Sequence, residues 1–189
     1  MDRDNFAKAQ GHWILARMGK RVLRPGGKEL TQKLISGLQI SSADNVVEFA
    51  PGLGYTAALA LTKQPKTYVG VDADEDAVAL LSQKVKGENV QFVLANAAGT
   101  KLADSSKNKV YGEAMLTMHA DKRKSEIIQE AHRILKKGGL YAIHEMGLVE
   151  VDEELKNKIQ KDLAFSIKVN ARPLTVNDGK CSWNKKDLP

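Results

Sequence analysis

The stretch Val46–Thr56 constrains the fold more than any other part of this sequence. It begins with Val46–Ala50, a run that is apolar except for Glu48, continues through a turn that contains Gly52 and Gly54, and enters a helical pattern at Tyr55. Glycines in a turn let the backbone approach a ligand closely, and the N–H groups at a helix start add a partial positive charge. The stretch therefore predicts a ligand site at the end of a buried strand. The alternative is an ordinary tight turn between a strand and a helix.

Short apolar runs alternate with helical patterns along most of the chain. Strands are predicted at Asn45–Ala50, Thr67–Asp72, Val90–Ala95, Val110–Thr117 and Leu140–Glu145. Helices are predicted at Tyr55–Thr62, Glu75–Lys86, Lys122–Lys137 and Asp152–Val169. Alternating strand and helix units fold into a mostly parallel sheet with helices on both faces. The sequence therefore predicts a Rossmann-like, doubly wound α/β domain.

Two helical patterns precede the first strand. One runs from Phe6 to Leu23, and the other covers about Lys28–Leu38. In an open α/β sheet the ligand crevice lies beyond the strand C-termini, under whatever precedes the first strand. Residues 1–40 are therefore predicted to form a helical lid over a single domain of residues 41–189, with Arg24 as a candidate to hold an acidic group. A solvent-facing arginine at a helix end is the alternative.

The composition is that of one globular domain, with 42% apolar and 28% charged residues. Charges interrupt every apolar run well short of the roughly 18 residues that a membrane span needs. A single cysteine, Cys181, excludes an internal disulfide, the four histidines are dispersed, and residues 2–4 are charged, unlike a secretory leader. We therefore expect a cytoplasmic protein without a metal site or membrane contact. The net charge of +6 comes from lysines that are scattered along the sequence. This scatter, together with an aromatic content of only 5%, argues against a groove that binds nucleic acid.

Asp72 follows Gly52 by 20 residues and ends the second apolar strand. A carboxylate at this tip can accept both hydroxyl protons of a ribose, which predicts a nucleoside ligand; a surface acid without a role is the alternative. Gly52–Ala57 also fits the G-x-G-x-x-A pattern of dinucleotide-binding folds. Glu48 discriminates between a dinucleotide and a cationic nucleoside, because an acid within the first strand repels a pyrophosphate and attracts a cation. The sequence therefore favours a cationic nucleoside.

These residues resemble the class I S-adenosylmethionine-dependent methyltransferases. The first motif of that family, an acid, three residues and then G-x-G, is matched by Glu48–Gly54. Further matches within residues 45–146 are the ribose acid Asp72, the adenine position Asn96–Ala97, the fourth strand at Glu113–Met118 and the turn Arg133–Gly139. The resemblance implies that S-adenosylmethionine is bound by Glu48, Phe49, Ala50, Gly52, Gly54, Tyr55, Asp72, Ala73, Asn96, Ala97 and Glu113.

The end of the chain departs from that family. Its usual sheet has seven strands, the last two forming an antiparallel hairpin, whereas only five strands are predicted here. The chain thus resembles a member shortened at its C-terminus, with the edge of the fifth strand exposed. An exposed edge invites pairing, so we expect either a homodimer through this edge or a tail, residues 170–189, folded over it.

Candidates for the acceptor side lie at the end of the fifth strand. His144 and Glu145, with Arg24, are the catalytic candidates, and His119 is a weaker one. His144 could take a proton from an acceptor, but strand alternation equally permits a hydrogen-bonded core histidine, the favoured interpretation. The predicted function is methyl transfer to a small molecule. An RNA methyltransferase, a nicotinamide-dependent oxidoreductase and a non-catalytic binding subunit are the alternatives.

Overall fold

The computed structural model describes residues 26–167 and 171–175 of the 189-residue chain. Residues 1–25 lie outside it, and with them Arg24 and the first predicted helix. The elements in chain order are α3 (Gly27–Leu38), β1 (Asn45–Phe49), α4 (Tyr55–Leu61), β2 (Thr67–Asp72), α5 (Glu75–Lys84), β3 (Val90–Leu94), β4 (Lys107–Glu113), the 3-10 turn η1 (Leu116–Met118), α6 (Asp121–Ile134), β5 (Leu135–His144), β6 (Gly147–Leu148), α7 (Glu153–Ile167) and β7 (Leu174–Thr175).

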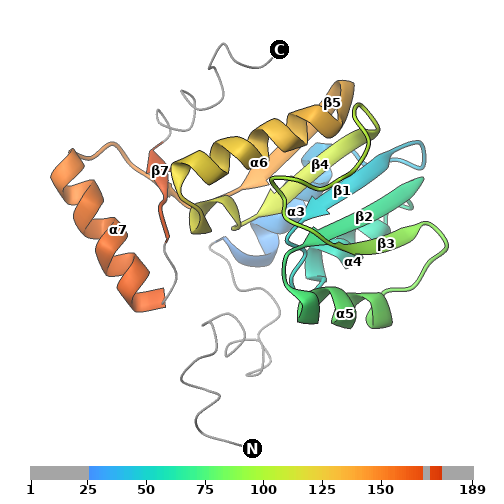
Figure 1. Cartoon of the computed structure of the whole chain (residues 1–189), viewed down its shortest axis with the longest axis horizontal. Helices are drawn as coiled ribbons and strands as arrows, with labels where there is room; N and C mark the ends of the chain where they lie inside the picture. Colours follow the sequence, from blue (N-terminus) through green and yellow to red (C-terminus); the bar gives the residue numbers. More distant parts are fainter. Residues whose placement is uncertain (1–25, 168–170, 176–189) are drawn as a thin grey trace, which may run out of the picture.

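The main sheet has five parallel strands in the order β3-β2-β1-β4-β5 (Figure 1). Strand order reverses at β1, since β2 and β3 extend to one side of it and β4 and β5 to the other. In such sheets the ligand crevice opens at the carboxyl ends of the strands, beside the point of reversal. The predicted doubly wound α/β fold is confirmed.

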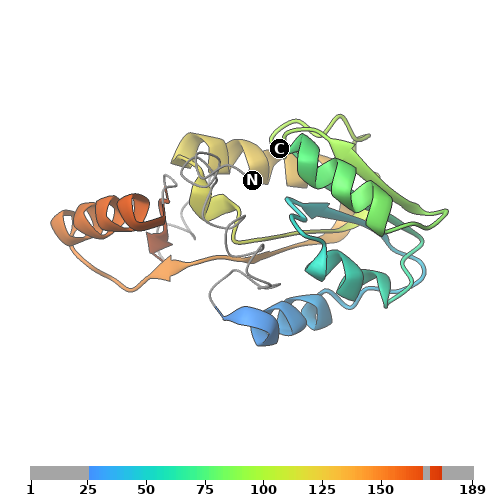
Figure 2. The ribbon, with the colours of Figure 1, turned by 90° about the horizontal axis from the view of Figure 1, so that it is seen from below.

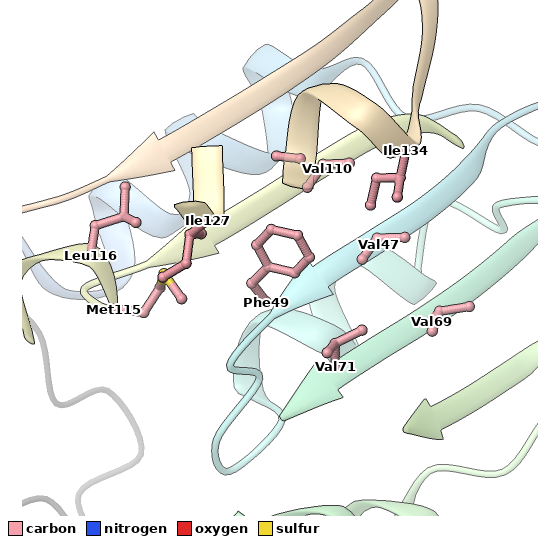
Figure 3. Close-up of a cluster of buried hydrophobic side chains, with 10 residues drawn as sticks. Val47, Phe49, Val69, Val71, Val110, Met115, Leu116, Ile127 and Ile134 are labelled. Atoms are coloured by element: carbon pink, nitrogen blue, oxygen red, sulfur yellow. The ribbon is translucent and has the colours of Figure 1, made fainter. Parts of the chain in front are cut away.

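Helices cover both faces of the sheet, as the view along the layers shows (Figure 2). On one face, the α4 face, α3 and α4 pack against Val46, Tyr68 and Tyr111. On the other face, the α6 face, α6 packs against a cluster that includes Val47 and Phe49 (Figure 3). A central strand buried on both faces appears in sequence as a continuous apolar run, which is why β1 was predictable within one residue.

The fourth and fifth strands differ from their predicted ranges. β4 ends at Glu113 rather than Thr117, because Ala114 turns into the left-handed region at φ 51° and η1 follows. β5 begins directly after α6, and its register against β4 shifts between Lys107 and Lys109. That shift accommodates residues 136–139, so the expected glycine turn is an irregularity within β5.

The described part of the predicted lid is α3. It packs against α4 and β5, and Ile35 and Leu38 are buried in the core of the α4 face. α3 thus helps to build the sheet's cover. Whether residues 1–40 act as a lid stays a prediction.

Residues 171–175 do not cover the edge of β5. β7 pairs in parallel with β6, beyond the end of β5, rather than forming an antiparallel hairpin. The N–H of Arg172 donates to the Thr117 carbonyl at 2.7 Å, and Nζ of the buried Lys124 donates to the Arg172 carbonyl at 2.6 Å. The prediction of a tail over β5 is therefore wrong for this segment. Among the described residues no strand pairs with the outer edge of β5.

Helix α7 extends from the sheet domain between β6 and β7 (Figure 1). It is rich in charged residues, and Phe165 on it is 88% exposed. Neither α7 nor any other helix in the described ranges has the length and apolar character needed to span a bilayer.

Candidate functional site

The turn between β1 and α4 is built from three residues in the left-handed region: Ala50 at φ 53°, Gly52 at φ 53° and Gly54 at φ 80°. A Cβ on Gly54 would come within 2.4 Å of Cδ2 of Leu81, so this glycine permits close packing of α4 against α5. Gly52 has open space around the position of a Cβ. Its bare backbone therefore faces a region that a ligand can enter.

Ala50 adds strain to the same turn. A non-glycine residue in the left-handed region costs about 1–2 kcal/mol, and such residues gather at functional sites. Ala50 is held there by its N–H, which donates to the Val71 carbonyl at 2.8 Å. Ala114, at the end of neighbouring β4, is also left-handed, and its N–H donates to the His144 carbonyl at 2.7 Å. The two strained alanines mark the same edge of the sheet.

Asp72 lies at the tip of β2, beside the glycine turn. Its Oδ2 accepts the Gly52 N–H at 3.3 Å, and its Oδ1 accepts the Asp74 N–H at 3.0 Å. Burial raises the pKa of the Asp72 carboxyl, and these two N–H groups offset part of that shift. Each carboxylate oxygen can accept a further hydrogen bond. The side chain is thus oriented by the backbone and suited to bind a pair of ligand hydroxyls.

Glu48 has a different environment. Its residue is 3% exposed, and Oε2 accepts hydrogen bonds from the hydroxyls of Tyr68 and Tyr111, the second at 2.7 Å. Burial, and next the charge of Glu48, raises the pKa of both tyrosines. The carboxylate is therefore buried on the α4 face of the sheet. It lies within β1, before the glycine turn that a ligand would touch.

Other predicted residues line the edge unequally. Phe49 is fully buried in the core of the α6 face (Figure 3). Its ring packs edge-on against Tyr141 at a centroid distance of 6.3 Å, so only its backbone is available to a ligand. Asn96 is exposed, and its Oδ1 accepts the Ala98 N–H at 2.9 Å. Ala73 is exposed, whereas Tyr55 and Ala97 are half-buried. Whether these residues bind a ligand remains a prediction.

A hydrogen-bonded network of side chains joins α4 to the ends of β4 and β5. Oε2 of Glu113, the last residue of β4, accepts the Thr56 hydroxyl of α4 at 2.6 Å. Oε1 of Glu113 lies 3.0 Å from Nδ1 of His144, the last residue of β5. The Glu113 and His144 side chains are 4% and 12% exposed. Glu113 and His144 were predicted from the sequence as separate candidates, and Thr56 was not predicted.

Glu145 binds the turn after β4. Its two oxygens accept the N–H groups of Met115, Leu116 and Thr117 at 2.8–3.0 Å and the Thr117 hydroxyl at 2.7 Å. The carboxylate therefore fixes η1. His119 follows η1 and is half-buried, and burial lowers its pKa.

Arg133, in the sequence motif before β5, fixes the loop between β3 and β4. Its guanidinium bonds both oxygens of Glu130 at 2.7 Å, the Leu102 carbonyl at 2.8 Å and the Asp104 carboxylate. Glu130 in turn accepts the N–H and the hydroxyl of Thr100 at 2.8 and 2.5 Å. The motif therefore has a structural role on the α6 face. Within the described ranges no three His, Cys, Asp or Glu side chains gather as metal ligands.

A parallel sheet with an open glycine turn after β1 and an oriented carboxylate at the tip of β2 is the arrangement found in α/β domains that bind nucleosides. Comparison with known proteins specifies the class further. A family model described as a methyltransferase domain matches residues 46–139. An uncharacterized protein of Haemophilus influenzae is 37% identical over 175 residues, covering 90% of this chain and 68% of that protein. The chain belongs to the class I S-adenosylmethionine-dependent methyltransferases.

Two more distant similarities agree with this membership. The phosphoethanolamine N-methyltransferase of Plasmodium falciparum is 22% identical over 147 residues, which cover 76% of this chain and 55% of that enzyme. The crystal structure of the YcgJ protein of Bacillus subtilis matches with a TM-score of 0.71 at 20% identity and covers 81% of this chain and 65% of that one. The chain therefore spans between about half and two thirds of the length of these three proteins.

Proposed function

We propose that this chain moves the methyl group of S-adenosylmethionine to a small-molecule acceptor in the cytoplasm. The observation that supports this most directly is the Asp72 carboxylate, oriented by the Gly52 N–H beside the open backbone of the same glycine. A nucleoside ligand needs an acceptor for its two ribose hydroxyls and a backbone that it can approach closely, and this edge offers both. Membership in the methyltransferase family makes S-adenosylmethionine the expected nucleoside.

S-adenosylmethionine, when bound, supplies a methyl group on a positively charged sulfur. The chain's own residues bind and orient it: Asp72 accepts the ribose hydroxyls, Asn96 and Ala97 border the adenine, and Glu113 closes the methionine side. The buried charge of Glu48 disfavours a pyrophosphate below the same loop. Methyl transfer depends mainly on alignment of the reacting atoms and on exclusion of water.

A small acceptor is supported by two observations. The Plasmodium relative is named for a small amine, phosphoethanolamine. The basic residues of this chain are scattered, with few aromatic side chains between them, which is unlike a surface that binds single-stranded nucleic acid.

Calorimetry with S-adenosylmethionine, S-adenosylhomocysteine and NAD tests the donor. We expect binding of both sulfur nucleosides and none of NAD; preferential binding of NAD would overturn the proposal. Transfer of radiolabelled methyl groups to phosphoethanolamine and to a ribosomal RNA fragment then compares acceptor classes. Labelling of the RNA alone, with a steep dependence on salt, would contradict a small-molecule acceptor.

A further inference from the structure

A buried polar network at the carboxyl edge of the sheet is formed by the side chains of Thr56, Glu113 and His144. Its members come from α4, β4 and β5, and Glu113 is bonded through both carboxylate oxygens. A carboxylate within a packed sheet edge costs free energy unless it is paired. Pairing explains why it is tolerated, but not why three elements present polar side chains at the same point.

The geometry sets the state of the histidine ring. A carboxylate only accepts hydrogen bonds, so the neutral ring of His144 carries its proton on Nδ1, toward Glu113. Nε2 then has a lone pair, and no described residue donates to it. The ring is fixed on one side by Glu113 and Thr56 and retains 12% exposure at the edge where β4 and β5 end. A base oriented by a carboxylate is the arrangement by which histidines accept protons from reacting hydroxyl or amine groups.

We infer that Nε2 of His144 takes a proton from the substrate that receives the methyl group. That substrate is therefore a nucleophile whose heteroatom carries a hydrogen, such as an alcohol, a phenol or a neutral amine. This inference rests on the proposed function. The heteroatom of the acceptor forms a bond to the methyl carbon while the carbon–sulfur bond breaks and its electron pair stays on sulfur. The acceptor's proton passes to Nε2, so the ring becomes cationic and the sulfur becomes neutral.

Glu113 and Thr56 act on this step as positioning residues. The carboxylate fixes the tautomer and stabilises the cationic ring, and the Thr56 hydroxyl holds the carboxylate in place. Ala114 contributes from the backbone, because its N–H donates to the His144 carbonyl.

Chemical modification of the wild-type protein tests the inference without a known acceptor. Diethyl pyrocarbonate acylates an unprotonated imidazole nitrogen, and peptide mass spectrometry reports each histidine separately. With S-adenosylhomocysteine at about 100 times its Kd, roughly one molecule in a hundred is unliganded. We therefore expect modification of His144 to slow by about tenfold or more, while exposed His132 on α6 is modified at an unchanged rate.

Two results would overturn the inference: no modification of His144 in the free protein, or an equal rate with S-adenosylhomocysteine bound. Nitrogen-detected NMR of the neutral ring gives an independent readout, since a proton on Nε2 instead of Nδ1 would also reject it. Failure of S-adenosylhomocysteine to bind in calorimetry would instead remove the proposed function, and the inference with it. The two failures are therefore distinguishable.

Turnover completes the test with the acceptor that the wild type methylates. His144→Gln is expected to lower kcat by about 10²- to 10⁴-fold, the contribution of a general base, with little change in S-adenosylmethionine affinity. Thr56→Val removes the hydroxyl at constant size and should lower kcat, whereas Thr56→Ser should restore it. Full activity of His144→Gln would refute the assignment.

Discussion

Glu48 in β1 and Asp72 in β2 are acids on neighbouring strands, and the sequence assigned both to one ligand. The structure gives them opposite environments. Glu48 is 3% exposed and accepts hydrogen bonds from two buried tyrosines. Asp72 is half-buried at the strand tip and accepts backbone N–H groups. Glu48 therefore joins β1 to β2 and β4 within the core, whereas Asp72 lies at the strand tip beside the glycine turn.

Glu48→Ala gives the largest expected effect. It leaves the hydroxyls of Tyr68 and Tyr111 buried without their acceptor, and because each buried unsatisfied donor costs about 1–3 kcal/mol, the two together cost about 2–6 kcal/mol. We expect the free energy of unfolding, measured in urea, to fall by that amount. Glu48→Gln keeps an acceptor and should cost less. A loss below about 1 kcal/mol for the alanine variant would be smaller than the cost of one unsatisfied hydroxyl. It would contradict a structural role for Glu48.

Glu130, a third carboxylate, is buried, and its contribution to stability can be measured from the pH dependence of unfolding. Hydrogen bonds from Arg133 lower its pKa to about 2 from the usual 4.5. A carboxyl whose pKa is lowered on folding stabilises the protein above its unfolded pKa, and that contribution disappears as the pH falls from 4.5 toward 2. The loss is about 3 kcal/mol at 1.36 kcal/mol per pKa unit. Urea titrations between pH 5 and pH 2 should show it, and Glu130→Gln should flatten that profile; an unchanged profile would exclude the pair as its cause.

Asp72→Ala should affect binding more than folding. Loss of hydrogen bonds to a charged group weakens nucleoside binding by about 1.5–3 kcal/mol, which calorimetry with S-adenosylhomocysteine can measure. Asp76→Asn, on an exposed acid in the first turn of α5, is the matched control and should bind normally. Unchanged affinity in Asp72→Ala would remove Asp72 from the site.

The pH dependence of binding sharpens the same point. Burial raises the pKa of Asp72 above its usual value of 3.8, and hydroxyls that donate to the carboxylate favour its ionised form. Affinity should therefore be full at neutral pH and fall on acidification through the raised pKa, by at most about tenfold per pH unit. Asp72→Asn should abolish this dependence. An acid profile identical in the variant would assign the dependence to another group.

Ala50→Gly is expected to have the smallest effect. Relief of the left-handed strain gains about 1–2 kcal/mol, and the extra backbone entropy of glycine costs about 0.5–1 kcal/mol. The net expectation is a slight increase in stability, visible as a higher midpoint in urea. A clear decrease would show that the Cβ of Ala50 makes contacts that outweigh its strain.

The sequence predicted the fold well where burial follows the backbone period. β1 and β2 are buried on both faces and were located within one residue. β4 was predicted to continue to Thr117, because Met115 and Leu116 are apolar; they are buried in a turn instead. Nothing in the residue types at this point announces the left-handed Ala114.

The sequence predicted that the glycine turn and Asp72 lie together at one edge of the sheet, and the structure brings them into contact. The glycine turn and Asp72 were named from spacing alone. The contact of Thr56 with Glu113 spans 57 residues, and that of Glu113 with His144 spans 31. Such contacts depend on strand register, and the shift between Lys107 and Lys109 decides which residue of β5 lies beside Glu113. No local pattern encodes that register.

The bridge Tyr68–Glu48–Tyr111 runs from β2 through β1 to β4, across the line where strand order reverses. Sliding β2 or β4 along β1 by one residue would rotate a tyrosine to the opposite face and leave the charge stranded. The two halves of the sheet are thereby held in one register, so the carboxyl ends of β2, β1 and β4 keep fixed positions relative to one another.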